Sequence, residues 1–333
     1  MVMNRYDRQI KFYGIGEAGQ SLIENATVGI IGCGALGTHL AESIARSGVK
    51  KIVIVDRDYV EVSNLQRQSL FKESDAENST PKVIACAREL KAIRSDLLLE
   101  TYIEHCDASL LEAAFLQCDC ILDATDNFET RLMINDFSYK YNIPWIYGAC
   151  VESTYVACPF IPGVTPCFNC VMGMLPVMNR TCDTVGIIEP AVNLATSYQM
   201  MYCMKILSRT PFEAKLVFGD VWQIDHTALK FSRMFNENCS TCGHSPTFPH
   251  LTYMQTETML CGRDTVQFTS LNFTETDLLR HLELHHIKHI ENPYFIRFKF
   301  KDHPMIWFKG GRLLIHEVKS VNIAKTIYHQ LFG

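Results

Sequence analysis

The fold of this chain is decided by Thr27-Val-Gly-Ile-Ile-Gly-Cys-Gly-Ala-Leu-Gly37. The stretch places an apolar run of strand length directly before a GxGxxG pattern, and Leu36, Leu40 and Ile44 then recur every four residues, as on one face of a helix. A strand, a glycine-rich turn and a helix in this order begin many nucleotide-binding α/β domains. We therefore predict a doubly wound, Rossmann-like α/β fold.

Apolar runs and helical patterns continue to alternate on the C-terminal side of this stretch, up to about residue 148. Such an alternation predicts a mostly parallel sheet with right-handed crossovers, and we expect an antiparallel continuation after it. The expected strands are 51–55, 120–123, 144–147, 153–161 and 217–221, and the expected helices are 83–93, 128–141 and 191–207.

The length of 333 residues allows about two domains. We expect a first domain over 1–248, which contains the stretch quoted above, and a small α+β extension over 249–333, to which we assign no chemistry. Three alternating strand-like segments and a helix from about Asn322 support the extension, the strands being 295–300, 305–308 and 313–315. The net charge of −5, without a Lys/Arg-rich run, argues against nucleic-acid binding through bulk charge.

The cellular location is inferred from what precedes and interrupts the apolar segments. The chain is charged by Arg5 and has no signal-peptide-like apolar stretch after it. Its most apolar region, 26–49, contains His39, Glu42 and Arg46, so it lacks the ~20 uninterrupted apolar residues that span a bilayer. We expect a cytoplasmic protein whose 14 cysteines are reduced and available for metal binding or catalysis.

The glycine-rich turn is the first candidate site. Gly32, Gly34 and Gly37 would let the backbone approach phosphates at the N-terminus of the following helix. Asp56 follows the second expected strand, where a carboxylate accepts hydrogen bonds from ribose hydroxyls. These residues alone fit a dehydrogenase and an ATP-dependent enzyme equally well.

Polar residues farther along separate the two possibilities. Hydride transfer has little use for a cluster of cations and a carboxylate near cofactor phosphates, whereas nucleotidyl transfer requires them on a triphosphate. The alternative is that Arg67 and Lys82 are solvated surface charges and that Asp126-Asn127 only caps a helix. The residues that favour ATP are Asp58, Asn64, Arg67, Lys82, Asp126 and Asn127.

Two CxxC pairs, Cys167/Cys170 and Cys239/Cys242, have the spacing of zinc knuckles. Four thiolates form a closed tetrahedral site without an open position for water, so zinc would be structural here. Because the pairs are far apart in sequence, the metal would attach the end of the first domain to its crossover region. Chance placement of cysteines is the alternative.

Several short motifs occur together in one order: Arg5-Tyr-Asp-Arg-Gln9, Gly32-Cys-Gly-Ala-Leu-Gly37, Ser63-Asn-Leu-Gln-Arg-Gln68, Pro81-Lys82, Asp123-Ala-Thr-Asp-Asn127 and the two CxxC pairs. Over roughly residues 4 to 245 the chain resembles the MoeB/ThiF adenylyltransferases, bacterial relatives of the adenylation domain of ubiquitin-activating enzymes. The extension resembles those of some Gram-positive members.

The resemblance implies roles for individual residues. Asp56 would hold the ribose, Asn64, Arg67 and Lys82 would contact phosphates, and Asp126 would ligate Mg²⁺. Arg8 would reach the ATP of the neighbouring subunit in a homodimer. The residues expected to take part in the chemistry are Arg67, Lys82, Asp126 and Cys182.

Cys182 lies in a segment without clear periodicity between Pro176 and Pro190, where a loop thiolate could attack an acyl adenylate or form a persulfide bond. In the resembling family, the cysteine at this place is proposed to link covalently to the carrier in some members and is dispensable in others. A free thiol without a step of its own is the alternative.

Three histidines, His281, His285 and His289, are four apart in a segment that we expect to be helical. Such spacing could in principle bind a metal. Because no further ligand type is indicated, a solvated polar face is the preferred interpretation.

The resemblance implies an activity. The C-terminal carboxylate of a small ubiquitin-like sulfur carrier ending in Gly-Gly, MoaD-like or ThiS-like, would attack the α-phosphate of ATP and release pyrophosphate. A sulfur donor of the cysteine desulfurase or rhodanese type would then yield a thiocarboxylate for molybdopterin or thiamine biosynthesis. Two alternatives stay open: a nicotinamide-dependent oxidoreductase, which would leave Arg67, Lys82 and Asp126 without a role, and a non-catalytic scaffold, which would be expected to lack some of them.

Overall fold

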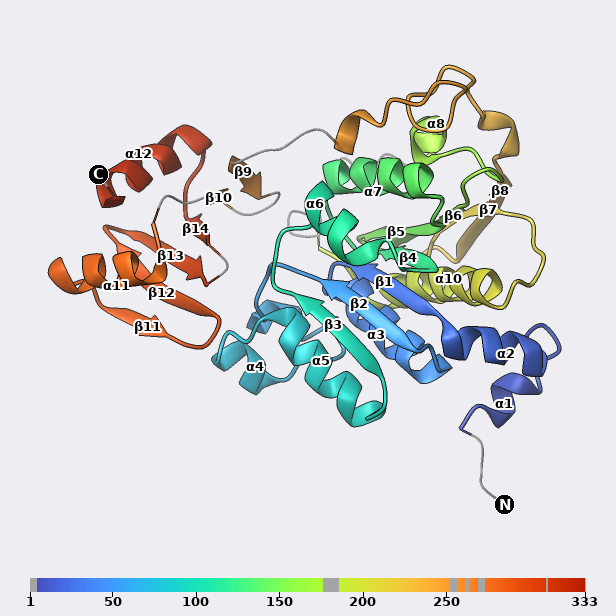
Figure 1. The fold of residues 1–333 in the computed structure, drawn as a ribbon, viewed down its shortest axis with the longest axis horizontal. Coiled ribbons are helices and arrows are strands. Elements are labelled where there is room, and N and C mark those ends of the chain that lie inside the picture. Colours follow the sequence, from blue (N-terminus) through green and yellow to red (C-terminus); the bar gives the residue numbers. More distant parts are fainter. Residues whose placement is uncertain are drawn as a thin grey trace. The chain divides into compact units, whose positions relative to one another are not determined.

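The chain forms two compact units, Met1–Tyr253 and Met254–Gly333, which are described separately (Figure 1). The computed structural model describes residues 5–175, 186–251, 257–260, 264–268, 273–309 and 311–332.

An eight-stranded sheet runs through the first unit in the order β3-β2-β1-β4-β5-β6-β7-β8. The pairs from β3 to β5 are parallel and those from β5 to β8 are antiparallel, so the expected mostly parallel sheet with an antiparallel continuation is confirmed. The strands are β1 Thr27–Ile31, β2 Lys51–Val55, β3 Leu98–Tyr102, β4 Cys120–Asp123, β5 Trp145–Val151, β6 Thr154–Phe160, β7 Lys215–Asp220 and β8 Asp225–Lys230.

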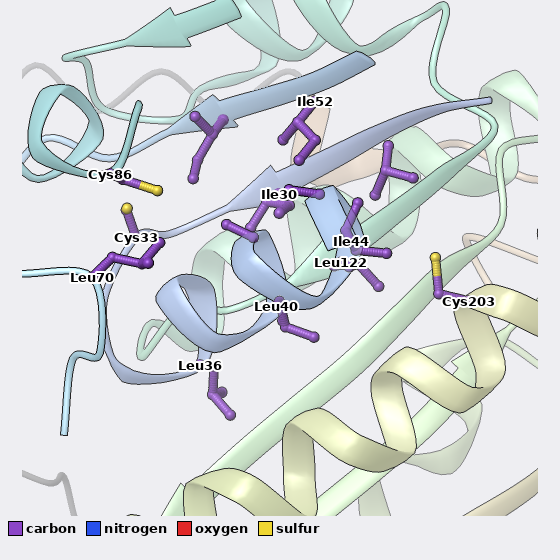
Figure 2. Close-up of a cluster of buried hydrophobic side chains, with 14 of the residues drawn as sticks. Ile30, Cys33, Leu36, Leu40, Ile44, Ile52, Leu70, Cys86, Leu122 and Cys203 are labelled. Atoms are coloured by element: carbon purple, nitrogen blue, oxygen red, sulfur yellow. The ribbon is translucent and has the colours of Figure 1, made fainter. Parts of the chain in front are cut away.

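Helices cover both faces of this sheet, as a doubly wound fold requires. Apolar side chains of α2 Gly16–Asn25, α3 Ala35–Ser47, α5 Lys82–Ile93 and α10 Glu189–Leu207 form one core with the sheet, part of which Figure 2 shows. Those of α7 Phe128–Tyr141, α8 Phe168–Val171 and the π-helical turn η2 Leu111–Phe115 form the core on the other face. The remaining short helices are α1 Asp7–Ile10, η1 Val62–Asn64, α4 Glu73–Glu77, α6 Ala108–Leu110, η3 Met172–Met174, η4 Ser232–Met234 and η5 Pro249–Leu251.

Helix α10 supplies a contact in the middle of the sheet. The ladder between β4 and β5 contains only the pairs Ile121–Trp145 and Leu122–Ile146. At this point the buried Gln199 of α10 donates from Nε2 to the carbonyl oxygens of Asp123 (2.7 Å) and Ile146 (3.2 Å). A Cβ on Gly148 would overlap the amide group of Gln199, so a glycine is required for this approach.

Strands β3 and β8 were not expected from the sequence, and both lie at the edges of the sheet. Their residues are mostly exposed or half-buried, and β3 carries Glu100, which forms an ion pair with Lys51 of the neighbouring strand. Edge strands of this kind lack the apolar run that marks a buried parallel strand.

The second unit contains a six-stranded antiparallel sheet in the order β11-β12-β13-β14-β10-β9. Leu278 and Leu282 of one helix and Ile327 of the other share a core with side chains from one face of the sheet. The elements are β9 Glu257–Leu260, β10 Thr265–Phe268, α11 Glu275–Leu284, β11 His289–Glu291, β12 Phe295–Phe300, β13 His303–Phe308, β14 Arg312–His316 and α12 Val321–Phe332. The extension is therefore an α+β unit, with more strands than the three expected.

One expectation for this unit is wrong. Helix α11 ends at Leu284, so His289 does not continue the helical face of His281 and His285 but lies in β11. The rings of His281 and His285 do lie together, with centroids 4.3 Å apart. In the part of the chain that the structure describes, no helix is both long and apolar enough to cross a bilayer.

Candidate functional site

Three of the parallel strands end at the same edge of the sheet, next to the predicted phosphate turn. Gly32 follows β1, Asp56 follows β2, and Asp123 is the last residue of β4. Because β1 pairs in parallel with β2 on one side and with β4 on the other, their carboxyl ends lie side by side. In open α/β sheets ligands bind in the crevice at this edge, where the strand order reverses.

The glycine turn has the geometry that its sequence predicts. Gly32 has φ +97°, a conformation that favours glycine, and a Cβ on Gly37 would overlap the carbonyl oxygen of Gly32. Gly34 precedes α3, and a Cβ there would have only the Gln68 amide nitrogen nearby, at 3.9 Å. Gly32 and Gly37 therefore shape the turn, while the space beside Gly34 is nearly open.

Asp56 is tied to the glycine turn by its carboxylate. Oδ2 accepts a hydrogen bond from the backbone N–H of Cys33 (2.6 Å), and Oδ1 accepts one from that of Asp58 (2.7 Å). Burial raises the pKa of this carboxyl group above its ordinary value, and the nearby Lys82 opposes the increase. Each carboxylate oxygen has a second lone pair, so the group can still accept hydrogen bonds from a ribose.

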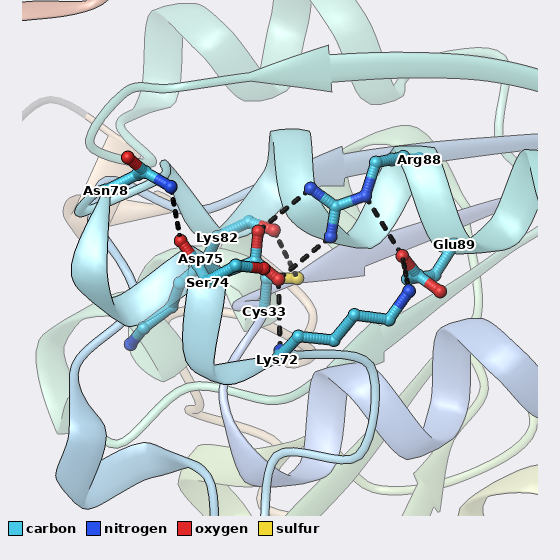
Figure 3. A network of polar contacts seen from close by, with 8 residues as sticks. All are labelled: Cys33, Lys72, Ser74, Asp75, Asn78, Lys82, Arg88 and Glu89. Atoms are coloured by element: carbon cyan, nitrogen blue, oxygen red, sulfur yellow. Dashed lines mark hydrogen bonds and ion pairs between the residues drawn. The ribbon is translucent and has the colours of Figure 1, made fainter.

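Lys82 is the first residue of α5, and its side chain is 5% exposed. Its Nζ lies 3.3 Å from Oδ2 of Asp58, which forms an ion pair that directs the ammonium group toward the carboxyl edge of β2. The Cys33 thiol lies 3.7 Å from the Lys82 carbonyl oxygen, so α5 begins in contact with the glycine turn (Figure 3).

An ion-pair network holds α5 against α4 (Figure 3). The Arg88 guanidinium donates to both carboxylate oxygens of Asp75, at 2.9 and 2.8 Å, and to Glu89 at 3.0 Å. Lys72 also contacts Glu89, at 2.7 Å. Burial raises the pKa of Asp75, but the hydrogen bonds from Arg88 and the Lys72 backbone outweigh it, and the net pKa lies below the ordinary value. The network stabilises the helix that positions Lys82.

Asn64 and Arg67 lie in the segment between β2 and α4. The Asn64 side chain is buried, and its Oδ1 accepts a hydrogen bond from the Glu61 backbone (3.0 Å). Arg67 donates to the Ser63 carbonyl oxygen (3.0 Å), and its own carbonyl oxygen lies 3.3 Å from the His39 ring on α3. These contacts hold the segment close to the first turns of α3.

Asp126 and Asn127 follow β4 and differ in their surroundings. Asn127 caps α7, because its Oδ1 accepts hydrogen bonds from the backbones of Glu129 (2.8 Å) and Thr130 (3.2 Å). The capping role of Asn127, which the sequence offered as the alternative to a nucleotide contact, is therefore confirmed. Asp126 is exposed at the carboxyl edge of the sheet, and the side chain that caps α7 is that of Asn127.

A buried ion pair beneath this loop was not assigned from the sequence. Asp123 is fully buried, and its Oδ2 accepts from Arg131 Nε (3.0 Å) while Oδ1 accepts from Thr125. Burial raises the pKa of Asp123, and Arg131 opposes the increase. An aspartate at the end of an apolar strand and an arginine eight residues later, in the first turn of the next helix, are a signal, although only the folded chain brings them together.

The two cysteine pairs meet in space. The sulfur atoms of all four residues lie within 4.8 Å of one another, with Cys167–Cys239 and Cys170–Cys242 at 3.5 Å and Cys167–Cys170 at 3.9 Å. Sulfurs about 2.3 Å from a tetrahedral zinc ion would lie about 3.8 Å apart, whereas a disulfide requires about 2.05 Å. The donor set and its spacing therefore fit a four-coordinate metal.

The surroundings of the cluster also fit a closed metal site. The Thr241 N–H points at Cys239 Sγ (3.4 Å), and the Thr241 hydroxyl donates to the buried Asp136 on α7. Burial and the adjacent Cys167 thiol raise the pKa of Cys170 to about 11, so without a cation these thiols resist deprotonation.

Two other predicted residues lie away from these clusters or outside the structure. Arg8, in α1, is 92% exposed and close to Asp7 (3.9 Å). Cys182 lies outside the described residues. The six cysteines that the sequence places in strands, helices or their edges are buried, as expected: Cys33, Cys86, Cys118, Cys120, Cys150 and Cys203.

The sheet order and the glycine turn place the chain in the Rossmann-like class of α/β proteins. More specifically, it belongs to the ThiF family, which matches residues 6–241. It is 40% identical over 334 residues to the sulfur carrier protein ThiS adenylyltransferase of Bacillus subtilis, covering 99% of both chains. The family resemblance seen in the sequence is confirmed.

Other relatives match the first unit. The molybdopterin-synthase adenylyltransferase of Escherichia coli is 30% identical over 245 residues, 72% of this chain and 96% of the relative. Among solved structures, Escherichia coli MccB with ATP superposes with a TM-score of 0.62 at 24% identity, covering 72% of this chain and 75% of that one. The last comparison shows similarity of fold alone.

Proposed function

We propose that this protein is an ATP-dependent adenylyltransferase that activates the C-terminal glycine carboxylate of a small ubiquitin-like sulfur carrier. The observation that carries the proposal is the 40% identity to a ThiS adenylyltransferase over 99% of both chains. The carboxylate attacks the α-phosphorus of ATP, an oxygen–phosphorus bond forms, and pyrophosphate leaves. The acyl adenylate then reacts with a sulfur donor of the cysteine desulfurase or rhodanese type.

The carrier is of the ThiS type. The ThiS adenylyltransferase from Bacillus subtilis matches nearly the full length, whereas the molybdopterin-synthase adenylyltransferase matches 72% of this chain. A MoaD-like carrier is the second candidate, because the molybdopterin-synthase adenylyltransferase of Escherichia coli, at 30% identity, is about as similar over the first unit as the ThiS adenylyltransferase of the same organism, at 33%. Residues 1–248 carry the adenylation chemistry, and no chemistry is assigned to 249–333.

The glycine turn and Asp56 bind the nucleotide. Backbone N–H groups at the start of α3 face the phosphates, and Asp56 accepts hydrogen bonds from the ribose. The support is the open side of Gly34 and the link between the Asp56 carboxylate and the backbone of the turn. Asp58 is part of the same site and acts by orienting Lys82.

Lys82, Arg67 and Asn64 stabilise charge on the phosphates. The Lys82 ammonium is prearranged by Asp58, so little reorganisation is needed when negative charge shifts to the leaving pyrophosphate. Arg67 lies at the half-exposed surface of its segment, where a triphosphate can reach it.

Asp126 holds Mg²⁺. Of the two carboxylates at the end of β4, Asp123 is buried and paired with Arg131, so only the exposed Asp126 is open to a hydrated cation. When bound, the ion offsets charge on the triphosphate. Asn127 is a candidate for a nucleotide contact through its amide NH₂, because its oxygen is engaged in the cap.

Zinc occupies the cluster of Cys167, Cys170, Cys239 and Cys242 and is structural, because four sulfur ligands leave no open position. The protein acts as a cytoplasmic homodimer in which the exposed Arg8 reaches the ATP of the partner subunit. Cys182 is not needed for adenylation, and its candidate step is the later attack on the acyl adenylate.

The test is pyrophosphate exchange. Labelled pyrophosphate should enter ATP only when the enzyme, Mg²⁺ and a ThiS-type carrier are all present. A carrier without its terminal glycine is the control and should support no exchange. Exchange with a MoaD-type carrier alone would assign the second candidate, and binding of NAD⁺ in preference to Mg-ATP would contradict the adenylyltransferase function.

A further inference from the structure

Arg57 stands between Asp56 and Asp58 at the carboxyl end of β2. Its Nη1 lies 3.1 Å from Nδ1 of His105, and its Nε lies 4.0 Å from Oδ1 of Asp58. Arg57 follows β2 and His105 follows β3, so the contact links the carboxyl ends of two neighbouring strands. The Arg57 side chain is 18% exposed, which leaves part of it open to a ligand.

The chemistry of the two side chains determines which of them donates the hydrogen bond. A guanidinium group has only donors, so His105 must accept at Nδ1 and carry its proton on Nε2. Asp58 is shared, because its Oδ1 faces Arg57 and its Oδ2 faces Lys82. The hydrogen bond to His105 restrains one nitrogen of the planar guanidinium, and the Asp58 carboxylate attracts the Nε side electrostatically from 4.0 Å, which together favour one orientation of the plane.

The sheet order locates this group relative to a bound nucleotide. The strands run β3-β2-β1-β4, with the glycine turn after β1 and the ribose-binding candidate Asp56 after β2. A nucleotide with its phosphates on the turn and its ribose at Asp56 extends its base farther in the same direction, toward the end of β3. Arg57 and His105 lie there.

We propose that Arg57 binds the base of ATP, with its guanidinium plane against the purine ring, and that His105 positions Arg57 for this contact. The inference rests on the proposed function only in taking ATP as the nucleotide. A planar cation stacks on an aromatic ring by electrostatic attraction and dispersion, and Arg suits this contact better than Lys does. Arg57 is a binding residue and His105 a positioning residue.

The experiment measures the Kd of two ligands without carrier, Mg-ATP and Mg-tripolyphosphate, the latter having no base. Arg57→Met and Arg57→Lys should each weaken ATP binding about fivefold to thirtyfold and leave tripolyphosphate within about twofold. The matched control is Arg46→Met, which removes an exposed arginine paired with Glu42 (2.8 Å) on α3 and should change neither Kd. Unchanged ATP binding in both Arg57 variants, or equal weakening for both ligands, would overturn the proposal.

His105→Ala tests the positioning. It should weaken ATP binding in the wild-type background and have no further effect in the Arg57→Met background. Equal losses in both backgrounds would show that His105 does not act through Arg57. In the exchange assay, the Arg57 variants should raise the KM for ATP and leave kcat within about twofold.

The two proposals fail separately. An enzyme that binds ATP through Arg57 but supports no exchange with any carrier would contradict the proposed function alone. Normal exchange by wild type, with a KM for ATP that is unchanged in both Arg57 variants, would contradict this inference alone.

Discussion

The carboxyl edge of the parallel sheet and the four-cysteine cluster are both built from residues far apart in sequence, but they differ in what faces outward. At the sheet edge, Asp126 and part of Arg57 are exposed, while Asp56 and Lys82 are held by contacts with Cys33 and Asp58. In the cluster the four sulfurs face one another. The difference teaches which site can receive a reactant and which can only hold the chain together.

The largest expected effect is at the open edge. Asp126→Ala should reduce carrier-dependent pyrophosphate exchange at least about 100-fold. The substitution would remove the protein ligand of Mg²⁺, and the negative charge of the triphosphate would no longer be offset. The melting temperature should not change, since Asp126 is exposed. Glu129→Ala, at an exposed position in the first turn of α7, is the control and should retain activity. Robust exchange by Asp126→Ala would remove its metal role.

In the four-cysteine cluster we expect the main effect on stability, whereas at the open edge we expect it on activity. Cys239→Ser should abolish the binding of one zinc per chain and lower the melting temperature by at least about 10 °C, because metal binding is coupled to folding. Cys118→Ser, at a buried cysteine outside the cluster, controls for the polar substitution and should keep its zinc. Purified protein without zinc whose stability does not fall on chelation would contradict a metal site.

A third prediction tests whether the open edge is complete within one chain. If Arg8 acts on the partner subunit, mixing Arg8→Ala chains with Asp126→Ala chains restores one site in each mixed dimer. Random mixing should recover about a quarter of wild-type exchange, although each variant alone is inactive. Verified mixed dimers without activity would place Arg8 outside the partner's site.

The smallest effect is expected for Cys182. Adenylation depends on positioning of ATP and charge stabilisation, so Cys182→Ala should keep pyrophosphate exchange within about threefold of wild type. Mass spectrometry of the carrier, after addition of a sulfur donor, then decides whether the thiol is used. Normal thiocarboxylate would show that Cys182 is dispensable, and lost exchange would show that its segment helps to form the ATP site.

The sequence predicted the parts of the fold that are buried on both sides. Strands β1, β2 and β4 are continuous apolar runs, and their positions followed from that property alone. Edge strand β8 has mostly exposed residues and therefore gave no such signal. Helix α11 ends at Leu284, five residues before His289. The expectation that His289 lies on this helix was wrong because the spacing of three histidines does not by itself predict how far a helix extends.

The candidate sites show the same limit. Motif spacing predicted which glycines shape the turn and which four cysteines would meet, because the glycine pattern and each CxxC pair are local, and the two pairs are the ones with knuckle spacing. The Asp123–Arg131 pair and the Arg57–His105 contact arise only from tertiary packing, so the sequence showed the residues but not the partnership. The choice of Asp126 over Asp123 likewise required the burial of each side chain.

The close approach of Gln199 to Gly148 means that these two positions constrain each other during evolution. The Gln199 amide bridges carbonyl oxygens of Asp123 and Ile146, where β4 and β5 no longer form a ladder, and the space it fills is the space a side chain at 148 would need. Neither residue can change first without a loss of stability, since a shorter residue at 199 removes the amide donor from both carbonyls and a Cβ at 148 would overlap the amide. Among related sequences, glycine at position 148 and glutamine at position 199 should therefore occur together. A sequence that loses one of the two residues first would pass through a less stable protein.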